Sequence, residues 1–319
     1  MTTPPHADGR AGIDAALVRR LIAAQFPRWS HLSVAPVEID GWDNRTYRLG
    51  ETMTVRLPTD EAYVPAIAKE DRWLPVLAPS LPVPVPPIVG RGEPGEGYPF
   101  EWSIRGWLDG DLARPERIDD MPRFAESVAG FVRALQGIDA TGGPAAGAHS
   151  FYRGAPPAHY DGETRRALAA LTGRIDTDRA AGVWDAALRA TWQGPPVWFH
   201  GDIAANNLLV EDGRLTAVLD FGTSGVGDPA CDLVIAWTMF SGDSREAFRR
   251  AVGQDDPAWA RARGWALWKA LICLAQDIDT DLGTTAGQAA VHRRVIEDVL
   301  ADHDRSTWAD WADWADWAT

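Results

Sequence analysis

Three side chains that carry oxygen ligands lie within the stretch HGDIAANNLLVEDGRLTAVLDFG, residues 200–222. Asp202 and Asp220 each follow a short apolar run, and Asn207 comes five residues after the first of these acids. Carboxylate and amide oxygens are hard ligands that suit Mg²⁺, which proteins usually hold with one or two carboxylates together with substrate phosphates. A further carboxylate can accept the proton of a hydroxyl nucleophile. The stretch therefore predicts a phosphoryl-transfer site with one base and two metal ligands.

Short strands are expected to bring these residues together. The apolar runs before the two acids are strand-like, and each delivers its acid at its carboxyl end. Residues 208–210 can pair with residues 216–219 across a short polar turn to form a β-hairpin. We expect Asp202, Asn207 and Asp220 to converge at one edge of that hairpin.

The N-terminal third of the chain contains short runs rich in β-branched and aromatic residues, separated by Gly, Asp and Asn, which is typical of antiparallel strands. Helical spacing of apolar residues predicts a helix over 13–27 and another over 62–78. The density of proline in the fourth expected strand favours a place at the edge of the sheet. Strands are expected at 32–40, 45–50, 52–58, 81–90 and 99–110.

The pattern changes near residues 104–110. Beyond this break most apolar residues recur at helical spacing. Helices are expected at 121–138, 162–175, 184–192, 232–240, 244–252, 257–278 and 286–303. A strand-rich part followed by a helical part predicts the α+β fold class.

Three motifs occur in the same order and at the same spacing as in kinases: HGDIAANN at 200–207, LDFG at 219–222 and GDPACDL at 227–233. Gly201 stands where protein kinases have an arginine. With these motifs the chain resembles the aminoglycoside phosphotransferase family of protein-kinase-like small-molecule kinases, which is related to choline kinases and macrolide phosphotransferases. The resemblance covers roughly residues 35–300 and is sharp only at 196–236.

The resemblance implies a protein-kinase-like bilobal fold. Residues 1–104 would form a small antiparallel-sheet lobe that binds the nucleotide. Residues 105–319 would form a mainly helical lobe for catalysis and acceptor binding. The implied reaction moves the γ-phosphate of ATP, or of GTP, to a hydroxyl group of a small molecule with the help of Mg²⁺.

The family's roles carry over to the matching positions of this chain. Asp202 is the implied catalytic base, and Asn207 and Asp220 are the implied Mg²⁺ ligands. The remaining polar residues of the motifs are implied to support the structure of the loop. Asp232 is implied to accept hydrogen bonds from the backbone of the loop. These supporting residues are His200, Asp228 and Asp232.

The nucleotide phosphates are expected near the segment 41–50, which is neither a Walker A loop nor a complete glycine-rich loop. In the resembling family this segment covers the triphosphate, and Asn44 and Thr46 are the residues expected to contribute. Arg56 follows on the next strand and Glu70 on the next helix, where a protein kinase pairs a lysine with a glutamate. Arginine binds phosphate well through its bidentate fork, so the pair is still expected to hold phosphates.

The base of the nucleotide is expected at the hinge between the lobes, around Ser103–Trp107. Backbone groups of Ser103, Ile104 and Trp107 would bind the adenine or guanine edge. Because backbone recognition leaves little trace in side chains, the sequence does not distinguish ATP from GTP.

The acceptor is expected to be an aminoglycoside-type antibiotic, so that the outcome would be resistance. The net charge of −14 and the acid run Asp277, Asp279 and Asp281 would suit a polycationic alcohol. A solvated helix end is the other interpretation of this run. A macrolide or another metabolite is the alternative acceptor, and a macrolide is favoured if tryptophans line the pocket. The alternative function from another class of protein is a nucleotide-binding module without turnover.

Composition and charge exclude other classes of protein. The net charge of −14 argues against nucleic acid and against an anionic membrane surface as partners. No apolar run approaches the roughly 20 residues of a membrane span, and the N-terminus shows no secretory signal. Two cysteines, Cys231 and Cys273, lie in apolar surroundings and predict reduced thiols in a cytoplasmic protein.

The chain ends in the repeat WADWADWADWAT, residues 308–319. On an α-helix four tryptophans at this spacing spread over about half of the circumference rather than forming one stripe. Aromatic residues at this density usually become buried, against the same lobe or against a neighbouring chain. The sequence leaves both possibilities and the oligomeric state open.

Overall fold

The computed structural model describes residues 12–38, 40–41, 43–279 and 286–317. The chain forms two compact units. The first comprises the residues up to Asp111 together with Thr216–Thr223, and the second comprises Leu112–Leu215 and the residues from Ser224 onward. The first unit therefore ends later than residue 104, and it takes in the segment around Asp220, which the sequence placed in the C-terminal lobe.

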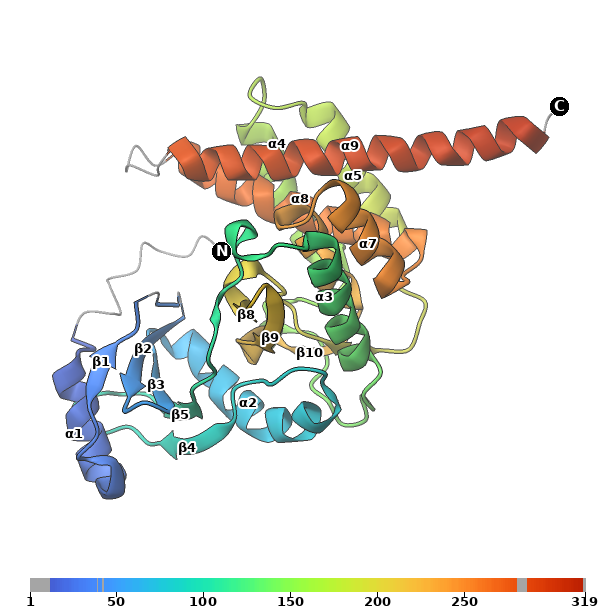
Figure 1. Cartoon of the computed structure of the whole chain (residues 1–319). Coiled ribbons are helices and arrows are strands. Elements are labelled where there is room, and N and C mark those ends of the chain that lie inside the picture. Colours follow the sequence, from blue (N-terminus) through green and yellow to red (C-terminus); the bar gives the residue numbers. More distant parts are fainter. Residues whose placement is uncertain (1–11, 39, 42, 280–285, 318–319) are drawn as a thin grey trace. The chain divides into compact units, whose positions relative to one another are not determined.

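The first unit is built on a five-stranded antiparallel sheet in the order β1-β2-β3-β5-β4. The proline-rich segment leads into β4 at the edge of this sheet, as predicted. Its helices are α1, which packs on β1, and α2, which contacts β4 and β5 (Figure 1). The element bounds are α1 Ala15–Gln25, β1 Val34–Pro36, β2 Asn44–Leu49, β3 Met53–Pro58, α2 Val64–Leu77, β4 Ile88–Gly92 and β5 Trp102–Gly106.

One face of this sheet forms the hydrophobic core of the first unit. The helix α1 begins at the N-cap Asp14, whose carboxylate accepts a hydrogen bond from the backbone N–H of Leu17 at 2.8 Å. Leu21 of α1 packs in one buried cluster with Val55 of β3 and Ile104 of β5, and all three are fully buried. Because side chains alternate along a strand, the neighbours of Val55 and Ile104 point to the other face, which leaves that face for polar residues.

The second unit is mainly helical (Figure 1). Helix α3 packs on α7, and α8 packs on α5 and α9. Strands β7 and β10 form an antiparallel pair, and β8 and β9 are neighbours in a small sheet, as the predicted hairpin requires. The bounds are α3 Met121–Gln136, α4 Asp161–Ala170, α5 Thr177–Arg189, β7 Val197–Phe199, β8 Leu208–Glu211, β10 Gly225–Gly227, α6 Ile235–Thr238, α7 Gly242–Val252, α8 Asp256–Asp279 and α9 Ala286–Trp317. The chain passes from one unit to the other within β6 Asp111–Leu112 and within β9 Arg214–Val218.

Several of the predicted helices differ in the structure, including α4, which ends at Ala170, and α5, which begins at Thr177. The segment 232–240 forms a 3₁₀ turn, Pro229–Leu233, followed by the short helix α6, because Asp228 caps the turn at Ala230 N–H. Helix α9 is longer than predicted and includes the backbone of the terminal repeat as far as Trp317. The side chains beyond residue 306 lie outside the described residues, so both interpretations of the tail stay predictions.

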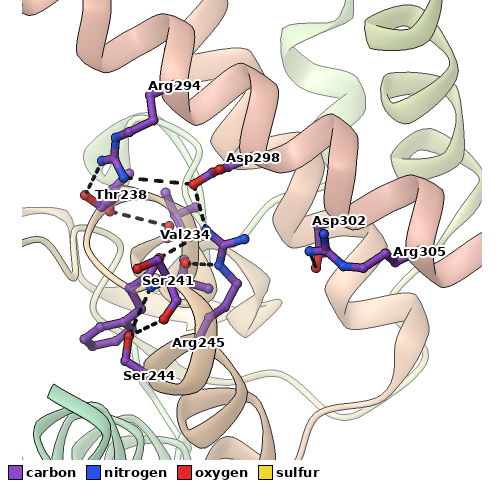
Figure 2. A network of polar contacts seen from close by, with 11 residues as sticks. Val234, Thr238, Ser241, Ser244, Arg245, Arg294, Asp298, Asp302 and Arg305 are labelled. Carbon is purple, nitrogen blue, oxygen red and sulfur yellow. Dashed lines mark hydrogen bonds and ion pairs between the residues drawn. The ribbon is translucent and has the colours of Figure 1, made fainter.

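A polar network joins α9 to the segment that contains α6 and α7 (Figure 2). Arg245 of α7 donates to the backbone oxygens of Ala236 at 2.7 Å and Phe240 at 3.1 Å and pairs with Asp298 of α9 at 2.8 Å. Arg294 of α9 also lies within 3.9 Å of Asp298. These contacts fix the N-terminal half of α9 in the second unit.

Candidate active site

A small pocket of about 10 Å³ lies on the polar face of the first unit. Four residues that the sequence predicted for nucleotide binding line it, Asn44, Arg56, Glu70 and Ser103, and so does the predicted metal ligand Asp220. This volume holds about one water molecule. The other lining residues are Asp43, Tyr63, Ala66, Ile67 and Gly222.

Arg56 lies between two carboxylates that line this pocket, those of Glu70 and Asp220. Its guanidinium lies 3.3 Å from Oε2 of Glu70 and 3.4 Å from Oδ1 of Asp220. Burial alone would lower the pKa of Arg56, but the carboxylates of Glu70 and Asp220 raise it above its ordinary value. Arg56 therefore stays charged, which suits it to bind phosphate.

Asp220 is held in a left-handed backbone conformation, with φ of 60°. Its Oδ1 accepts a hydrogen bond from the backbone N–H of Gly222 at 3.3 Å. A Cβ added to Gly222 would lie 3.1 Å from that same oxygen. Glycine at position 222 therefore leaves room for the carboxylate, which is 37% exposed and available to a ligand.

The loop that carries Asp202 lies in the second unit. Asn207 Nδ2 donates to Oδ2 of Asp202 at 2.8 Å and to the backbone oxygen of Asp202 at 2.9 Å. His200 is fully buried, and its Nδ1 accepts a hydrogen bond from the backbone N–H of Asp202 at 3.2 Å. Gly201 has a φ of 86°, a conformation that side-chain-bearing residues rarely adopt. This backbone requirement explains glycine in place of the arginine of protein kinases.

Asp232 anchors the loop through hydrogen bonds to its backbone. Its two carboxylate oxygens accept the backbone N–H groups of His200 at 2.8 Å and Gly201 at 2.6 Å, the contact expected from the sequence. Burial raises the pKa of Asp232, and His200 and the two N–H donors counteract this effect. The loop is thus positioned by hydrogen bonds to groups that are removed from water.

Asp228 supports the same loop indirectly. Its carboxylate caps the backbone N–H of Ala230 at 3.0 Å and pairs with Arg261 of α8 at 2.6 Å. Both side chains of this ion pair are buried. Arg261 also lies over the ring of Trp192, 5.4 Å from its centroid. Asp228 therefore has a structural position in this unit.

Part of the segment predicted to bind the nucleotide base lies within the sheet. Ile104 pairs with Val55 on one side and with Gly90 on the other, because β5 lies inside the sheet. Ser103 and Ile104 therefore use their backbones within the sheet. The backbone N–H of Trp107 donates to the oxygen of Thr52 at 2.8 Å. The adenine or guanine base of a nucleotide can bind these backbone groups only where the sheet leaves them without a hydrogen-bond partner.

Thr46 lies outside the pocket lining. It pairs with Arg56 in the β2–β3 ladder, and its backbone N–H donates to Asp40 Oδ1 at 2.9 Å. This bond orders the loop before β2, and Asn44 at the start of β2 reaches the pocket.

The acid run predicted for the acceptor is only partly described. Asp277 in α8 is 14% exposed and lies 3.9 Å from Nε2 of His292 in α9. Burial lowers the pKa of His292, while Asp277 counteracts this effect. Asp279 is the last residue of α8 and its side chain lies outside the described residues, as does the whole of Asp281.

Sequence reasoning missed two arginines of these sites, Arg105 and Arg261. Both are buried, with 1% and 2% of their surfaces exposed. Each lies in an otherwise apolar run, SIRGWL and PAWARARGWALW. A buried charge requires a partner, so an arginine inside an apolar strand or helix was the available signal.

The donor atoms fit Mg²⁺. Asp220 offers an accessible carboxylate, and Asn207, which uses its Nδ2 on Asp202, has an amide oxygen that accepts only one long hydrogen bond in the described residues, from Nδ2 of Asn206 at 3.4 Å. Mg²⁺ takes hard oxygen ligands and leaves most of its positions to phosphates and water. That Asn207 and Asp220 share one ion stays a prediction from the sequence, since the two residues belong to different units.

The fold and these two sets of polar residues define a kinase-like phosphotransferase. The model of the phosphotransferase enzyme family matches residues 34–265, and the chain belongs to this family. No helix among the described residues is long and apolar enough to cross a membrane.

Named phosphotransferases for aminoglycosides and for macrolides are similar to this chain. An aminoglycoside 3'-phosphotransferase from Escherichia coli is 33% identical over 73 residues, which cover 23% of this chain and 27% of that protein. The chain thus matches about a quarter of the length of this curated relative.

Solved structures match over nearly the whole fold. The GDP and kanamycin complex of APH(2")-IIia has a TM-score of 0.67 at 16% identity, covering 89% of this chain and 98% of that one. The macrolide 2'-phosphotransferase MphH from Brachybacterium faecium has a TM-score of 0.57 at 25% identity, covering 89% and 97%.

Proposed function

We propose that the protein is a Mg²⁺-dependent O-phosphotransferase that moves the γ-phosphate of ATP or GTP to a hydroxyl group of a small molecule. The observation that carries the proposal is the double hydrogen bond from Asn207 to the carboxylate and backbone oxygen of Asp202. This contact orients an exposed carboxylate that can accept the proton of the acceptor hydroxyl. Structures of similar proteins that contain GDP, ADP or ATP support the choice of nucleotide.

The chain's residues divide the proposed reaction between them. Asp202 accepts the proton of the hydroxyl, and Asn207 keeps the Asp202 carboxylate in its orientation. Arg56 binds phosphate oxygens, and its positive charge offsets the charge that they carry in the transition state. A bound Mg²⁺ would supply further charge neutralisation. No covalent phosphoenzyme is needed, because the hydroxyl attacks the phosphorus directly.

The experiment measures nucleoside diphosphate release with a panel of alcohols, for the wild type and Asp202→Asn. Asp212→Asn is the matched control, because Asp212 is an exposed acid in the β8–β9 turn, and asparagine tolerates its φ of 50°. We expect acceptor-dependent release in the wild type and the control and its loss in Asp202→Asn. Nucleotide binding without release for every acceptor tested would favour the non-catalytic module.

For the acceptor we propose an aminoglycoside-type antibiotic. The net charge of −14 favours a polycationic ligand, and the curated relative from Escherichia coli carries this name. Attraction between exposed charges is screened over a Debye length of about 8 Å at physiological ionic strength. The KM for the acceptor should therefore rise with salt more steeply than the KM for the nucleotide.

A macrolide is the second candidate acceptor, and the 25% identity to a macrolide 2'-phosphotransferase favours it. In the second unit Tyr160 stacks on Trp268 at 4.0 Å, and Arg153 lies over Trp265 and Trp268. The two tryptophans are buried, with 3% and 4% exposed, which indicates packing more than ligand binding. Turnover confined to macrolides, with a flat response to salt, would replace the aminoglycoside proposal with this one.

A further inference from the structure

Arg105 lies on the same face of the sheet as the nucleotide pocket. Arg56 of β3 pairs with Ser103 of β5, two positions before Arg105. Side chains two positions apart on a strand point to the same face. Arg56, Ser103 and Arg105 therefore share the polar face, and Ile104 between them points into the hydrophobic core.

The two arginines share one carboxylate oxygen. Oε2 of Glu70 lies 3.1 Å from Nη2 of Arg105 and 3.3 Å from Nη1 of Arg56. Arg105 is 1% exposed, Glu70 is 5% exposed and Arg56 is 18% exposed. Arg105 therefore holds the carboxylate from the buried side, and Arg56 meets it from the side that is open to the pocket.

Arg105 also contacts a second carboxylate. Its Nη1 lies 2.8 Å from Oδ1 of Asp71, and its Nε has no hydrogen bond within the described residues. A buried guanidinium of this kind requires its carboxylate partners, and the carboxylates require it. Arg105 therefore supports the sheet through Asp71 and Glu70, and its contact with Glu70 links it to Arg56 as well.

Arg56 is held loosely on both sides. Its contacts with Glu70 at 3.3 Å and with Asp220 at 3.4 Å are longer than the roughly 2.7–2.9 Å of strong charge-assisted hydrogen bonds. Because Glu70 already receives Arg105, its attraction for Arg56 is divided between two cations. Arg56 thus remains close to its partners without a short contact that a phosphate would have to break.

We propose that Arg105 is a positioning residue of the nucleotide site. It fixes and partly neutralises Glu70, so that the guanidinium of Arg56 stays in place and available to the phosphates of a nucleoside triphosphate. Without Arg105, Glu70 pairs fully with Arg56 and competes with the phosphates. The inference rests on the proposed function, because it assigns Arg56 to the phosphates.

The test compares the affinity for Mg·ADP, measured by direct titration, with the steady-state constants. We expect Arg105→Met to weaken Mg·ADP binding about tenfold, equivalent to about 1.4 kcal/mol. The nucleotide KM should rise in proportion while kcat stays within about twofold, because binding and not the chemical step is affected. The double variant Glu70→Gln with Arg105→Met should bind no more weakly than Glu70→Gln alone, because the effect of Arg105 passes through Glu70.

Arg263→Met is the matched control for a lost buried ion pair. Arg263 pairs with Asp302 at 3.0 Å in the second unit, and both are buried. This variant should lower the thermal midpoint and leave the Mg·ADP affinity unchanged. If Arg105→Met does not fold, Arg105→Lys replaces it, with an expected loss of about threefold, because lysine keeps the charge but lacks the fork.

The outcomes separate this inference from the proposed function. Wild-type affinity for Mg·ADP in a folded Arg105→Met protein, or in Arg105→Lys where Met does not fold, would overturn the role of Arg105. So would a double variant that binds clearly more weakly than Glu70→Gln. A wild-type protein that binds no Mg·ADP would instead overturn the proposed function, and this inference with it.

Discussion

The two sets of polar residues are built in opposite ways. In the catalytic loop of the second unit, the contacts of Asp202 and Asp232 with their neighbours include bonds of 2.6 to 2.9 Å, several of them to backbone groups. In the first unit, Arg56 contacts Glu70 and Asp220 at 3.3 and 3.4 Å through side chains alone. The proposed base is thus fixed before a substrate arrives, while the arginine proposed to bind phosphate can exchange partners.

This difference follows from what each group must do. A general base works best when its carboxylate already has the geometry of proton transfer. A phosphate-binding arginine must give up its resident carboxylates when the nucleotide binds, and long contacts make that exchange less costly.

The largest effect is expected at the fixed base. Asp202→Asn should lower kcat by about 10²–10⁴, the contribution of a positioned general base. Nucleotide affinity should stay nearly unchanged, because the substitution keeps the size of the side chain. Single-turnover kinetics with saturating nucleotide measure the chemical step. Wild-type turnover in this variant would remove Asp202 from its assigned role.

The anchor of the loop should matter for both stability and rate. Asp232→Ala leaves two buried backbone N–H groups without acceptors, at His200 and Gly201. We expect a loss of about 2–4 kcal/mol in the free energy of unfolding, measured by urea denaturation, together with a lower kcat. Asp228→Asn should lower stability by a similar amount while kcat falls less, because it leaves the buried guanidinium of Arg261 without its ion-pair partner but does not touch the N–H groups of the loop. Equal stability of Asp232→Ala and wild type would contradict the anchoring role.

The adjustable arginine should affect binding rather than chemistry. Arg56→Ala should raise the nucleotide KM by about tenfold or more, since a charge-assisted contact to phosphate contributes about 1.5–3 kcal/mol. Arg56→Lys should retain part of the affinity, and Arg20→Ala serves as the control, because Arg20 is an exposed arginine of α1 that pairs with Glu96. The acceptor KM should not change. An unchanged nucleotide KM would make Arg56 a structural residue of the sheet.

The smallest effect concerns pH. Burial lowers the pKa of Lys69 to about 8 from 10.5, although Glu70 and Asp220 counteract burial. Between about pH 8 and pH 10.5, Lys69 is still protonated in the unfolded chain but has lost its proton in the folded protein. The contribution of Lys69 to the free energy of unfolding therefore rises with pH. Relative to Lys69→Met, the wild type should gain about 1–2 kcal/mol between about pH 7 and about pH 9.5. Parallel thermal melts measure this difference, and a constant offset would contradict it.

The sequence predicted what depends on local pattern. The motifs around Asp202, Asn207 and Asp220 and the alternation along β2 and β3 are short-range features, and they led to the fold class and to the family. The contact of Asp232 with the loop backbone could be predicted because the third motif follows the other two in the order found in the resembling family.

Features that depend on register and on distant partners were not predictable in the same way. Arg105 meets Glu70 only because β3 and β5 pair in one register. Arg261 meets Asp228 only because α8 packs against the 3₁₀ turn. The sequence also does not show that β5 is an inner strand, and the nucleotide-base site expected at Ser103 and Ile104 stays a prediction.

The most direct measurement of the central claim is mass spectrometry of the acceptor after incubation with Mg·ATP or Mg·GTP. The panel contains aminoglycosides, macrolides, choline-like amines and neutral sugars, each with wild type, Asp202→Asn and Asp212→Asn. We expect one class of alcohol to gain a single phosphoryl group with wild type and Asp212→Asn, and to gain almost none with Asp202→Asn. Equal phosphorylation by Asp202→Asn and wild type would contradict the account.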